Sequence, residues 1–386
     1  MTIPARTLTL LAAAFLCATT VAGLAPAADA AQPFTVLKVT DQANGQVTAQ
    51  AYANGIVYLG GDFTQISDHS GNTWNRNHAA AINVSTGKVT SWNPNIDGPV
   101  WAIKTDGSRV YMGGHFTTVG GVKDTNLTAT NTGNGDIAPG WKGKAGYVVR
   151  DLLVHSTTLY VGGGFDKLSG AARSSVGAVS TSTGAAKPFN VHVGGPGTHM
   201  VRSLAMSPDG TRLYLGGYFT TLNGQSAYHI GAVDPTSGAT KSFSWHPSGS
   251  TYPDDMQANS TGLFVGFAGK GTDLHGIGSF SLTTGAARWV FHTCGDTQDL
   301  ELSGTTMYIG GHLRCIKSLT QWPVQVLGAV NQSNGDPVSW DVTANIGCPK
   351  GCLGVWDIQL CGSVMCVGGD STRFNGKLQS KFAIFS

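Results

Sequence analysis

The sequence has few charged residues and few residues that favour helices. Lys, Arg, Asp and Glu make up 12% of the 386 positions, about half the usual share of a soluble domain. Of the 22 acidic residues only Glu301 is a glutamate, whereas glycine occupies 54 positions. A chain with this composition is not mainly helical. Because 24 basic residues face 22 acidic ones without any basic block, nucleic-acid binding through bulk charge is also excluded.

Long apolar runs are missing except at the N-terminus. Arg6 precedes an apolar stretch, Thr7–Leu24, and Ala28-Asp29-Ala30 has the small-x-small pattern of a cleavage site. The alternative, a membrane anchor, is disfavoured because the stretch has polar residues at its centre and lacks a positive flank. Residues 1–30 are therefore predicted to be a signal peptide, and residues 31–386 a secreted, extracellular chain that does not span a membrane.

Signatures of common catalytic and cofactor sites are missing too. The chain has no G-x-S-x-G elbow, no HExxH and no phosphate loop. Its repeats differ from the Trp-bearing repeats of quinoprotein dehydrogenases, so no quinone and no other cofactor is predicted. Whether the chain is an enzyme stays open at this point.

Cysteine is confined to the last part of the predicted mature chain. An even set of six in an exported chain indicates disulfides. The alternative, a zinc site, lacks accompanying histidines at zinc-site spacing, so no metal is predicted. We expect three local pairs, which are Cys294–Cys315, Cys348–Cys352 and Cys361–Cys366.

An internal repeat is the strongest feature that is present. The pattern apolar-aromatic-apolar-Gly-Gly recurs about every 51 residues. Each unit has four apolar segments separated by turn signals such as Asp106-Gly107 and Thr236-Ser237-Gly238. Seven such units predict an all-β fold, a seven-bladed β-propeller with four antiparallel strands per blade. The copies are Val57–Gly61, Val110–Gly114, Leu159–Gly163, Leu213–Gly217, a degenerate Leu263–Phe267, Met307–Gly311 and Met365–Gly369.

The two ends of the predicted mature chain complement each other. Phe382–Ser386 matches the third strand of a unit whose fourth strand is missing. Pro33–Val36 matches the fourth strand Pro188–Val191. We therefore expect the N-terminal strand to complete the last blade and close the ring of a single domain over residues 31–386, which is expected to be a monomer.

Four units contain the motif Gly-Gly-x-Phe, at Gly60–Phe63, Gly113–Phe116, Gly162–Phe165 and Gly216–Phe219. The motif resembles the repeats of the delta-60-type β-propeller family, which comprises secreted, mostly bacterial proteins largely of unknown function. The resemblance covers the whole mature chain, although units five to seven depart from the motif. It implies a propeller fold and supplies no catalytic motif.

The connections between the second and third strands are long and varied, so we expect any ligand site on the face where they lie. His, Arg and Trp side chains on this face suit sugar hydroxyls and carboxylates. His115 and Trp356 are among these candidates. The alternative for any single residue is a solvated loop surface.

Four of the predicted innermost strands begin with aspartate, at Asp151, Asp255, Asp299 and Asp357. A ring of carboxylates near the channel mouth could bind a cation or supply the acid and base for sugar hydrolysis. The alternative, which the repetition favours, is that each aspartate accepts hydrogen bonds from backbone N–H groups at the strand start.

Unit six combines several unusual residues. Asp299 and Glu301 alternate along one strand and therefore face the same way. His312 and Arg314 open the long loop of this unit, where the predicted Cys294–Cys315 bridge would hold them near the channel mouth. Such an arrangement would make a preorganised site. The alternative is that the disulfide only stabilises a unit whose Gly-Gly-x-Phe motif is broken.

The predicted function is that of a secreted binding or scaffold propeller that recognises a glycan or an extracellular surface protein through the long-loop face. The alternative is a polysaccharide-active hydrolase or lyase on the same face, with two acids about 5–10 Å apart beside aromatic side chains. The candidate ligand-binding residues are His115, Asp255, Asp299, Glu301, His312, Arg314, Trp356 and Asp357.

Overall fold

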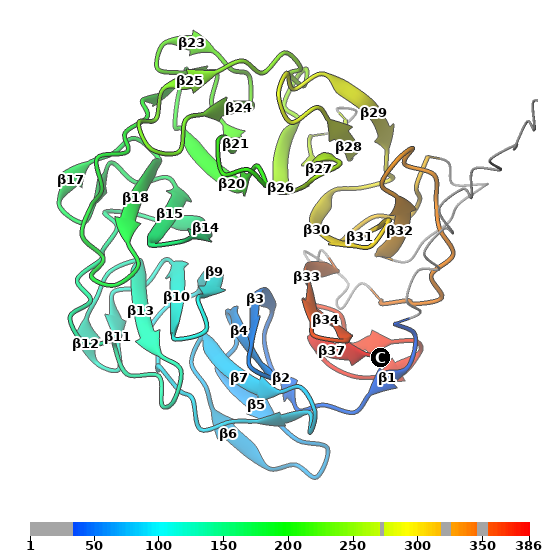
Figure 1. Ribbon diagram of the computed structural model, residues 1–386. Helices are drawn as coiled ribbons and strands as arrows, with labels where there is room; N and C mark the ends of the chain where they lie inside the picture. The colour runs from blue at the N-terminus through cyan, green and yellow to red at the C-terminus, as the bar shows by residue number, and fades with distance from the viewer. Residues whose placement is uncertain (1–33, 271–273, 318–325, 346–353) are drawn as a thin grey trace, which may run out of the picture.

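The molecule is built from short antiparallel strands. A computed structural model describes residues 34–270, 274–317, 326–345 and 354–386, and these residues contain no helix. The predicted signal peptide and the predicted Cys348–Cys352 pair lie outside the described residues. Figure 1 shows the sheets arranged in a ring, and the predicted all-β class is confirmed.

One strand from each repeat lies innermost in the ring (Figure 1). Each of these strands packs against the next one along the chain, and the last of them packs against the first. They are β3 (Val47–Ala53), β9 (Val100–Thr105), β14 (Val149–His155), β20 (Met200–Met206), β26 (Tyr252–Asn259), β30 (Thr297–Ser303) and β33 (Val355–Cys361).

The aromatic-Gly-Gly segments form the second strand of each sheet, and a third strand follows outside it. The second strands are β4 (Ile56–Gly61), β10 (Arg109–Gly114), β15 (Thr158–Gly163), β21 (Leu213–Tyr218), β27 (Gly262–Ala268), β31 (Thr306–Gly311) and β34 (Val364–Gly369). The third strands are β7 (Ala79–Asn83), β13 (Leu127–Asn131), β18 (Val176–Ser180), β24 (Ile230–Val233), β28 (Gly276–Phe280), β32 (Leu327–Asn331) and β37 (Phe382–Phe385).

A fourth strand is present in four of these sheets and reduced in the other three. It is β8 (Lys88–Val89), β25 (Thr240–Lys241), β29 (Ala287–His292) or β1 (Leu37–Lys38). The sheets of β13, β18 and β32 instead have one bridge each, at Ile137, Ala186 and Pro337. Because proline has no N–H to donate, Pro139 and Pro188, just after two of these bridges, end the pairing there. In the third sheet the pairing continues past Pro337 to Val338, which donates to Ala329 at 2.9 Å. The prediction of four full strands in every unit therefore holds for four of these sheets and fails for the other three.

The N-terminal segment joins the sheet that contains the C-terminus. In β1, Leu37 pairs with Phe385 and Lys38 with Ile384. Val36 and Ser386 exchange two backbone hydrogen bonds of 3.1 and 3.0 Å. Phe34 is buried, 5.7 Å from Tyr308 between ring centroids.

The glycine pairs of the repeat lie where neighbouring sheets approach each other closely. A Cβ atom added to Gly368 would lie 2.7 Å from Cγ1 of Val47 in the next sheet. One added to Gly266 would lie 2.9 Å from Cγ2 of Thr297. Real Cβ atoms do not approach this closely, so the first glycine of the pair is required by the packing between sheets.

Aromatic pairs fill the space between the second and fourth segments of the units. Tyr58 packs edge-on against Trp92 with 5.1 Å between centroids, and Tyr308 packs against Trp340 at 4.8 Å. In the last unit Cys366 takes the aromatic position and forms a disulfide with Cys361. Cys294 is bonded to Cys315. Both of these predicted pairings are confirmed.

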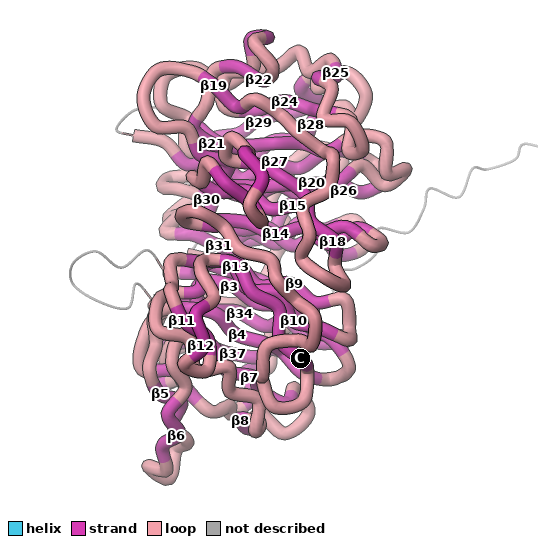
Figure 2. The backbone as a smooth tube through the Cα atoms, turned by 90° about the vertical axis from the view of Figure 1, so that its left-hand side faces the viewer, coloured by secondary structure: helices cyan, strands magenta, loops and turns pink. Residues whose placement is uncertain are grey.

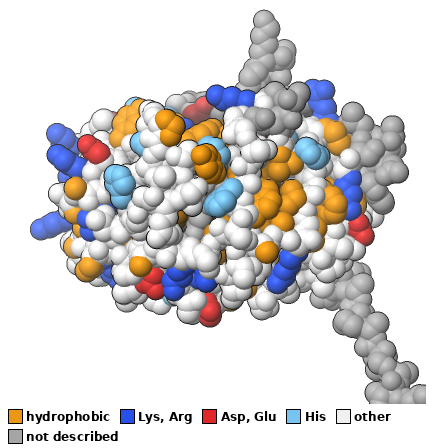
Figure 3. All heavy atoms as spheres, turned by 90° about the horizontal axis from the view of Figure 1, so that it is seen from above, with side chains coloured by type: hydrophobic (Ala, Val, Ile, Leu, Met, Phe, Trp, Pro, Cys, Tyr) orange, Lys and Arg blue, Asp and Glu red, His pale blue; other side chains and the backbone are white. Residues whose placement is uncertain are grey.

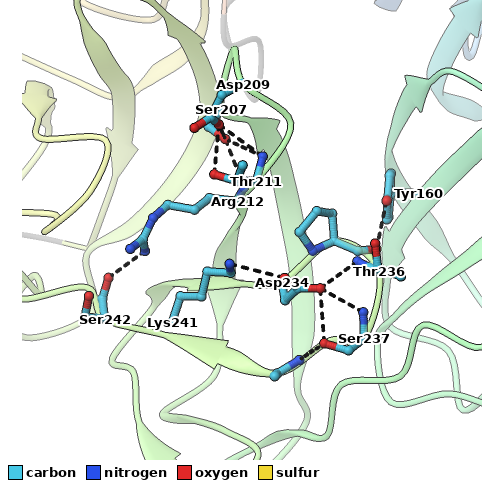
Figure 4. A network of polar contacts seen from close by, with 12 residues as sticks. Tyr160, Ser207, Asp209, Thr211, Arg212, Asp234, Thr236, Ser237, Lys241 and Ser242 are labelled. Carbon is cyan, nitrogen blue, oxygen red and sulfur yellow. Dashed lines mark hydrogen bonds and ion pairs between the residues drawn. The ribbon is translucent and has the colours of Figure 1, made fainter.

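Aspartate side chains hold the short turns, as Figure 4 shows for one unit. Asp234 accepts hydrogen bonds from the backbone N–H groups of Thr236 and Ser237, both at 3.0 Å. The bond from Ser237 in particular lowers the pKa of Asp234 to about 2. Tyr160, from the preceding unit, donates its hydroxyl to the carbonyl of Pro235 at 2.8 Å. These Asx-type turns account for the predicted hairpins and also link neighbouring units.

Most of the long connections are hairpins that pair with the link entering the same unit. β22 (Thr221–Leu222) pairs with β19 (Val193–Gly194), and Val119 is bridged to Ile96. The β5 (Gln65–Ser67) and β6 (Thr73–Asn75) hairpin lies at the outer edge of the ring in Figures 1 and 2. The long, varied connections are therefore largely hairpins paired with the link, and we call them latch hairpins. The apolar residue that pairs with the link is buried in six units, as Ile66, Val119, Leu168, Leu222, Ile316 and Phe374.

Charged side chains are scattered among uncharged ones on the edge of the ring that Figure 3 shows. This agrees with the low share of charged residues in the sequence. Within the described residues, no helix is long and apolar enough to cross a membrane.

Candidate functional site

Each innermost strand has a β-bulge at the same place near its start. In β14 the pairing passes from Val149 directly to Asp151, and Arg150 is the extra residue. A bulge turns the extra side chain out of the regular alternation of the strand, and such bulges are common beside functional sites. The seven extra residues, here called the bulge residues, are Thr48, Trp101, Arg150, Arg202, Asp254, Gln298 and Trp356.

All seven bulge residues line one cavity of about 160 Å³. We call it the mouth cavity. It lies at the end of the ring where the innermost strands begin and the second strands end, which is also where the long connections start. The bulge residues supply two indoles, two guanidinium groups, one carboxylate, one amide and one hydroxyl. Strands that share one repeat pattern thus form a cavity with a chemically varied lining.

The two arginines of the mouth cavity have different partners. Arg202 Nε donates to Asp254 Oδ1 at 2.6 Å, and this ion pair more than offsets burial, so the pKa of Arg202 is raised. The Arg150 guanidinium carbon lies 3.9 Å from the centre of the Trp101 ring. Burial, together with repulsion by Arg202, lowers the pKa of Arg150 to about 10. Arg150 is therefore a partly buried cation close to a second one, Arg202.

The four predicted aspartates follow the bulge positions and connect neighbouring sheets. Each accepts a hydrogen bond from a backbone N–H of the next innermost strand around the ring, which for Asp357 in β33 is β3. This is the backbone role expected of these residues, with the difference that the N–H group belongs to the next sheet. The bonds run to Asp151 from Leu204 (2.7 Å), to Asp255 from Leu300 (3.2 Å), to Asp299 from Ile358 (2.5 Å) and to Asp357 from Gln50 (3.0 Å).

Lys104, which the sequence did not single out, lies among these carboxyl groups. It lines the mouth cavity and also a second cavity of about 410 Å³, which later residues of the same strands form. Burial alone would lower its pKa, but the surrounding carboxylates, first Asp151 and then Asp357, raise it. The sequence did contain a signal for Lys104, because Lys104 occupies the same position of the repeat as Glu301.

Burial raises the pKa of the ring carboxyls despite Lys104 and the backbone bonds. The pKa of Asp151 is raised to about 7 and that of Asp357 to about 6. The pKa values of Asp255 and Asp299 are raised in the same way. Burial thus favours the protonated form of these carboxyls, while Lys104 and the backbone bonds favour the charged form.

Glu301 belongs to the second cavity and is tightly held. Oε1 accepts a hydrogen bond from the N–H of Leu360 at 3.2 Å, and Oε2 accepts one from Gln257 Nε2 at 3.0 Å. Burial raises the pKa of Glu301 to about 7. Its two oxygens thus connect three neighbouring inner strands, β26, β30 and β33.

The structure does not bring all the candidates of unit six together. Asp299 lines both cavities and Glu301 lines the second, whereas His312 and Arg314 line neither. Arg314 is exposed, and His312 Nε2 lies 3.7 Å from Asp296 Oδ2. The reason is that this connection runs outward as a latch, with Ile316 bridged to Thr293. In the described part of the chain no group of three or more His, Cys, Asp or Glu residues is placed to hold a metal ion.

The two remaining candidates lie at or beside the mouth cavity. Trp356 is a bulge residue and lines it. His115 is exposed, with its ring parallel to that of Trp101 at 6.3 Å and edge-on to Tyr147 at 5.5 Å. The sequence analysis noted Trp356 but missed Trp101, Arg202 and Lys104. The sequence did contain a signal for the bulge residues, because the residue type at this position differs between most units while the residues on either side stay similar.

Comparison with known proteins supports the fold and gives no function. No protein-family model and no curated protein matches this chain. Among solved structures, it is similar to the computationally designed Ika8 protein, with 12% identity and a TM-score of 0.53. The match covers 90% of this chain and 98% of the designed one. At this identity the similarity shows the fold alone.

Proposed function

We propose that this chain is a secreted binding protein that takes the end of a glycan in the mouth cavity. The single observation behind the proposal is the ring of bulge residues, which differ in chemistry and converge on one cavity. Trp356 offers a flat apolar face for a sugar ring, whereas Trp101 already carries the Arg150 guanidinium. Arg150, Arg202 and Gln298 offer donors for its oxygen atoms.

The architecture that we propose is a closed seven-bladed propeller of the delta-60 type. In its support, β33 packs against β3, and Asp357 accepts hydrogen bonds from Gln50 across that junction. The pairing of β1 with β37 brings the two ends of the chain into one sheet. The two disulfides and the N-terminal apolar stretch support export.

The size of the mouth cavity limits what can enter. Pockets for drug-sized ligands have volumes of about 300–1,000 Å³, and the mouth cavity has about 160 Å³. We therefore expect a terminal sugar residue to enter the cavity while the rest of the glycan lies across the long-connection face.

The test is a glycan array probed with residues 31–386, followed by titration of the hits. Trp356→Ala should weaken binding at least tenfold, because it removes the aromatic face on which the sugar ring would pack. Trp74→Ala is the matched control, since Trp74 lies on the β6 hairpin and lines neither cavity. If no glycan binds, or if both variants bind like the unchanged chain, the proposal is wrong.

A polysaccharide-active enzyme is the second candidate function. It is favoured by the pKa of Glu301, which at about 7 suits a general acid or base. Against it, the hydrogen bonds of Glu301 to Leu360 and Gln257 account for both oxygens. A reducing-sugar assay on the glycans that bind decides between the two. Turnover that Glu301→Gln abolishes would establish the enzyme.

A further inference from the structure

Arg150 differs from other arginines of the molecule in the polar contacts of its side chain. The structure describes no hydrogen bond and no ion pair of its side chain, and its Nε is buried without an acceptor among the described residues. Nε of Arg76 and of Arg173 is buried in the same way, but their terminal nitrogens have acceptors. Arg76 donates to the carbonyl of Thr90 and Arg173 to that of Lys187, both at 2.7 Å. Because a buried donor without an acceptor is unfavourable, the place beside Arg150 is suited to an acceptor group.

The charges around Arg150 favour an anion. Arg202 lies close enough to depress its pKa, and Asp254, another bulge residue, is already paired with Arg202. Asp151, the next residue, accepts backbone bonds from Leu152 and Leu204. The other acids of the cavity, Asp255, Asp299 and Asp357, also accept backbone bonds, so no described carboxylate is paired with Arg150.

The geometry selects a carboxylate among anions. Stacking on Trp101 fixes the plane of the guanidinium group, so its edge is presented in a defined orientation. A planar guanidinium edge pairs with a carboxylate through two parallel hydrogen bonds. Asp151 and Asp254 line the same cavity and would repel a dianionic phosphate more strongly than a carboxylate, which carries a single negative charge.

We propose that the mouth cavity binds the carboxylate of a terminal uronic acid, with Arg150 as the group that holds the carboxylate and an indole beside the sugar ring. This inference rests on the proposed glycan-binding function and names its ligand class. Trp356 lines the same cavity, and its Nε1 also lacks an acceptor among the described residues. A uronic acid offers both the anion for Arg150 and a flat ring face for an indole.

The test is calorimetric titration of residues 31–386 with three probes, which are methyl glucuronide, methyl glucoside and acetate. The glucuronide should bind, and Arg150→Gln should weaken that binding at least tenfold. Arg150→Lys should recover only part of the affinity, because an ammonium group cannot pair through two parallel bonds. Arg288→Gln is the matched control for charge, since Arg288 lies exposed on the outer strand β29 and lines neither cavity. Its affinity should equal that of the unchanged chain.

The outcomes separate this inference from the function on which it rests. If the glucoside binds as well as the glucuronide, or if Arg150→Gln binds both normally, the carboxylate inference is wrong and glycan binding stands. If acetate binds as tightly as the glucuronide and depends on Arg150, the carboxylate site stands and glycan binding is wrong. If none of the probes binds, the inference is wrong. Melting curves of each variant show whether it is folded, and Trp101→Phe replaces Arg150→Gln should the latter unfold.

Discussion

At the scale of single residues, Lys104 and the carboxyls around it control the stability of the ring centre. The sequence pattern identified Asp151, Asp255, Asp299 and Asp357, because the same residue recurs at the same place in the repeat. It did not identify their partners, since each N–H group comes from the next unit and depends on how two sheets pack. The contact between Lys104 and these acids depends on the same packing, which no local pattern encodes.

Removing Lys104 should destabilise the protein in a way that depends on pH. Lys104→Met keeps an apolar stem but leaves the carboxyls without their cation. Removal of one partner from a buried charge cluster costs about 3–5 kcal/mol. Because the carboxyls can also lose their charge by protonation, we expect the larger loss at pH 8 and a clearly smaller one at pH 5. Urea unfolding at both pH values measures this, and equal losses would contradict it.

Glu301 should make the protein less stable as the pH rises. Its pKa of about 7 in the folded protein exceeds the value of about 4.3 in an unfolded chain, so folding favours the protonated form. That stabilisation is fully present below about pH 4 and is lost as the pH rises through about 7. Asp151 and Asp357 act in the same direction. Each such carboxyl changes the free energy of unfolding by at most about 1.4 kcal/mol per pH unit.

The measurement is the free energy of unfolding between pH 5 and pH 8. Glu301→Gln should reduce its slope, since an amide does not titrate. Asp166→Asn, at an exposed position, serves as the control and should leave the slope unchanged. A slope that is the same in all three proteins would show that Glu301 is not the group responsible.

At the scale of elements, the sequence predicts the turns and the repeated strands but does not predict the bulges and the latch hairpins. Strict alternation places Arg150 and Asp151 on opposite sides of a strand. The bulge brings both to the mouth cavity instead. Turns, repeats and aromatic pairs were predictable because they are local or recur with a fixed period. Bulges and latches depend on which segments pair, and the variety of the latch sequences suggested free loops.

The latch hairpins should contribute to stability and leave ligand binding unchanged. Leu222 is fully buried and pairs with Val193, so Leu222→Ala should cost about 2–5 kcal/mol. Gln225→Ala, at an exposed position of the same hairpin, should change stability by less than about 0.5 kcal/mol. Urea unfolding and titration with the bound glycan test both parts. Loss of binding in folded Leu222→Ala would place the ligand site on the latches.

At the scale of the whole molecule, the units of the ring share one sequence pattern. The mouth cavity is lined in part by positions at which the units differ. The repeat predicted the number and order of the inner strands, which the described residues show one after another around the ring. It also drew attention to Asp299 and Glu301, which the structure places in bonds between sheets. The mouth cavity is lined by the bulge position, at which most units carry a different residue. The repeated aspartates thus connect neighbouring sheets, and the bulge residues, which differ between units, line the mouth cavity.

The ends of the chain provide the test of the ring as a whole. Deleting residues 31–38 removes the β1 pairing with β37 and the burial of Phe34 against Tyr308. Loss of a buried phenylalanine alone costs about 3–5 kcal/mol, so the melting temperature should fall by several degrees or more. The deletion also exposes the edge of β37, which favours association of chains. Val36→Asp, at a side chain that is 63% exposed, is the control and should melt as the full chain does. Calorimetry and light scattering measure both effects, and an unchanged melt of the shortened chain would show that the ring does not depend on its N-terminal strand.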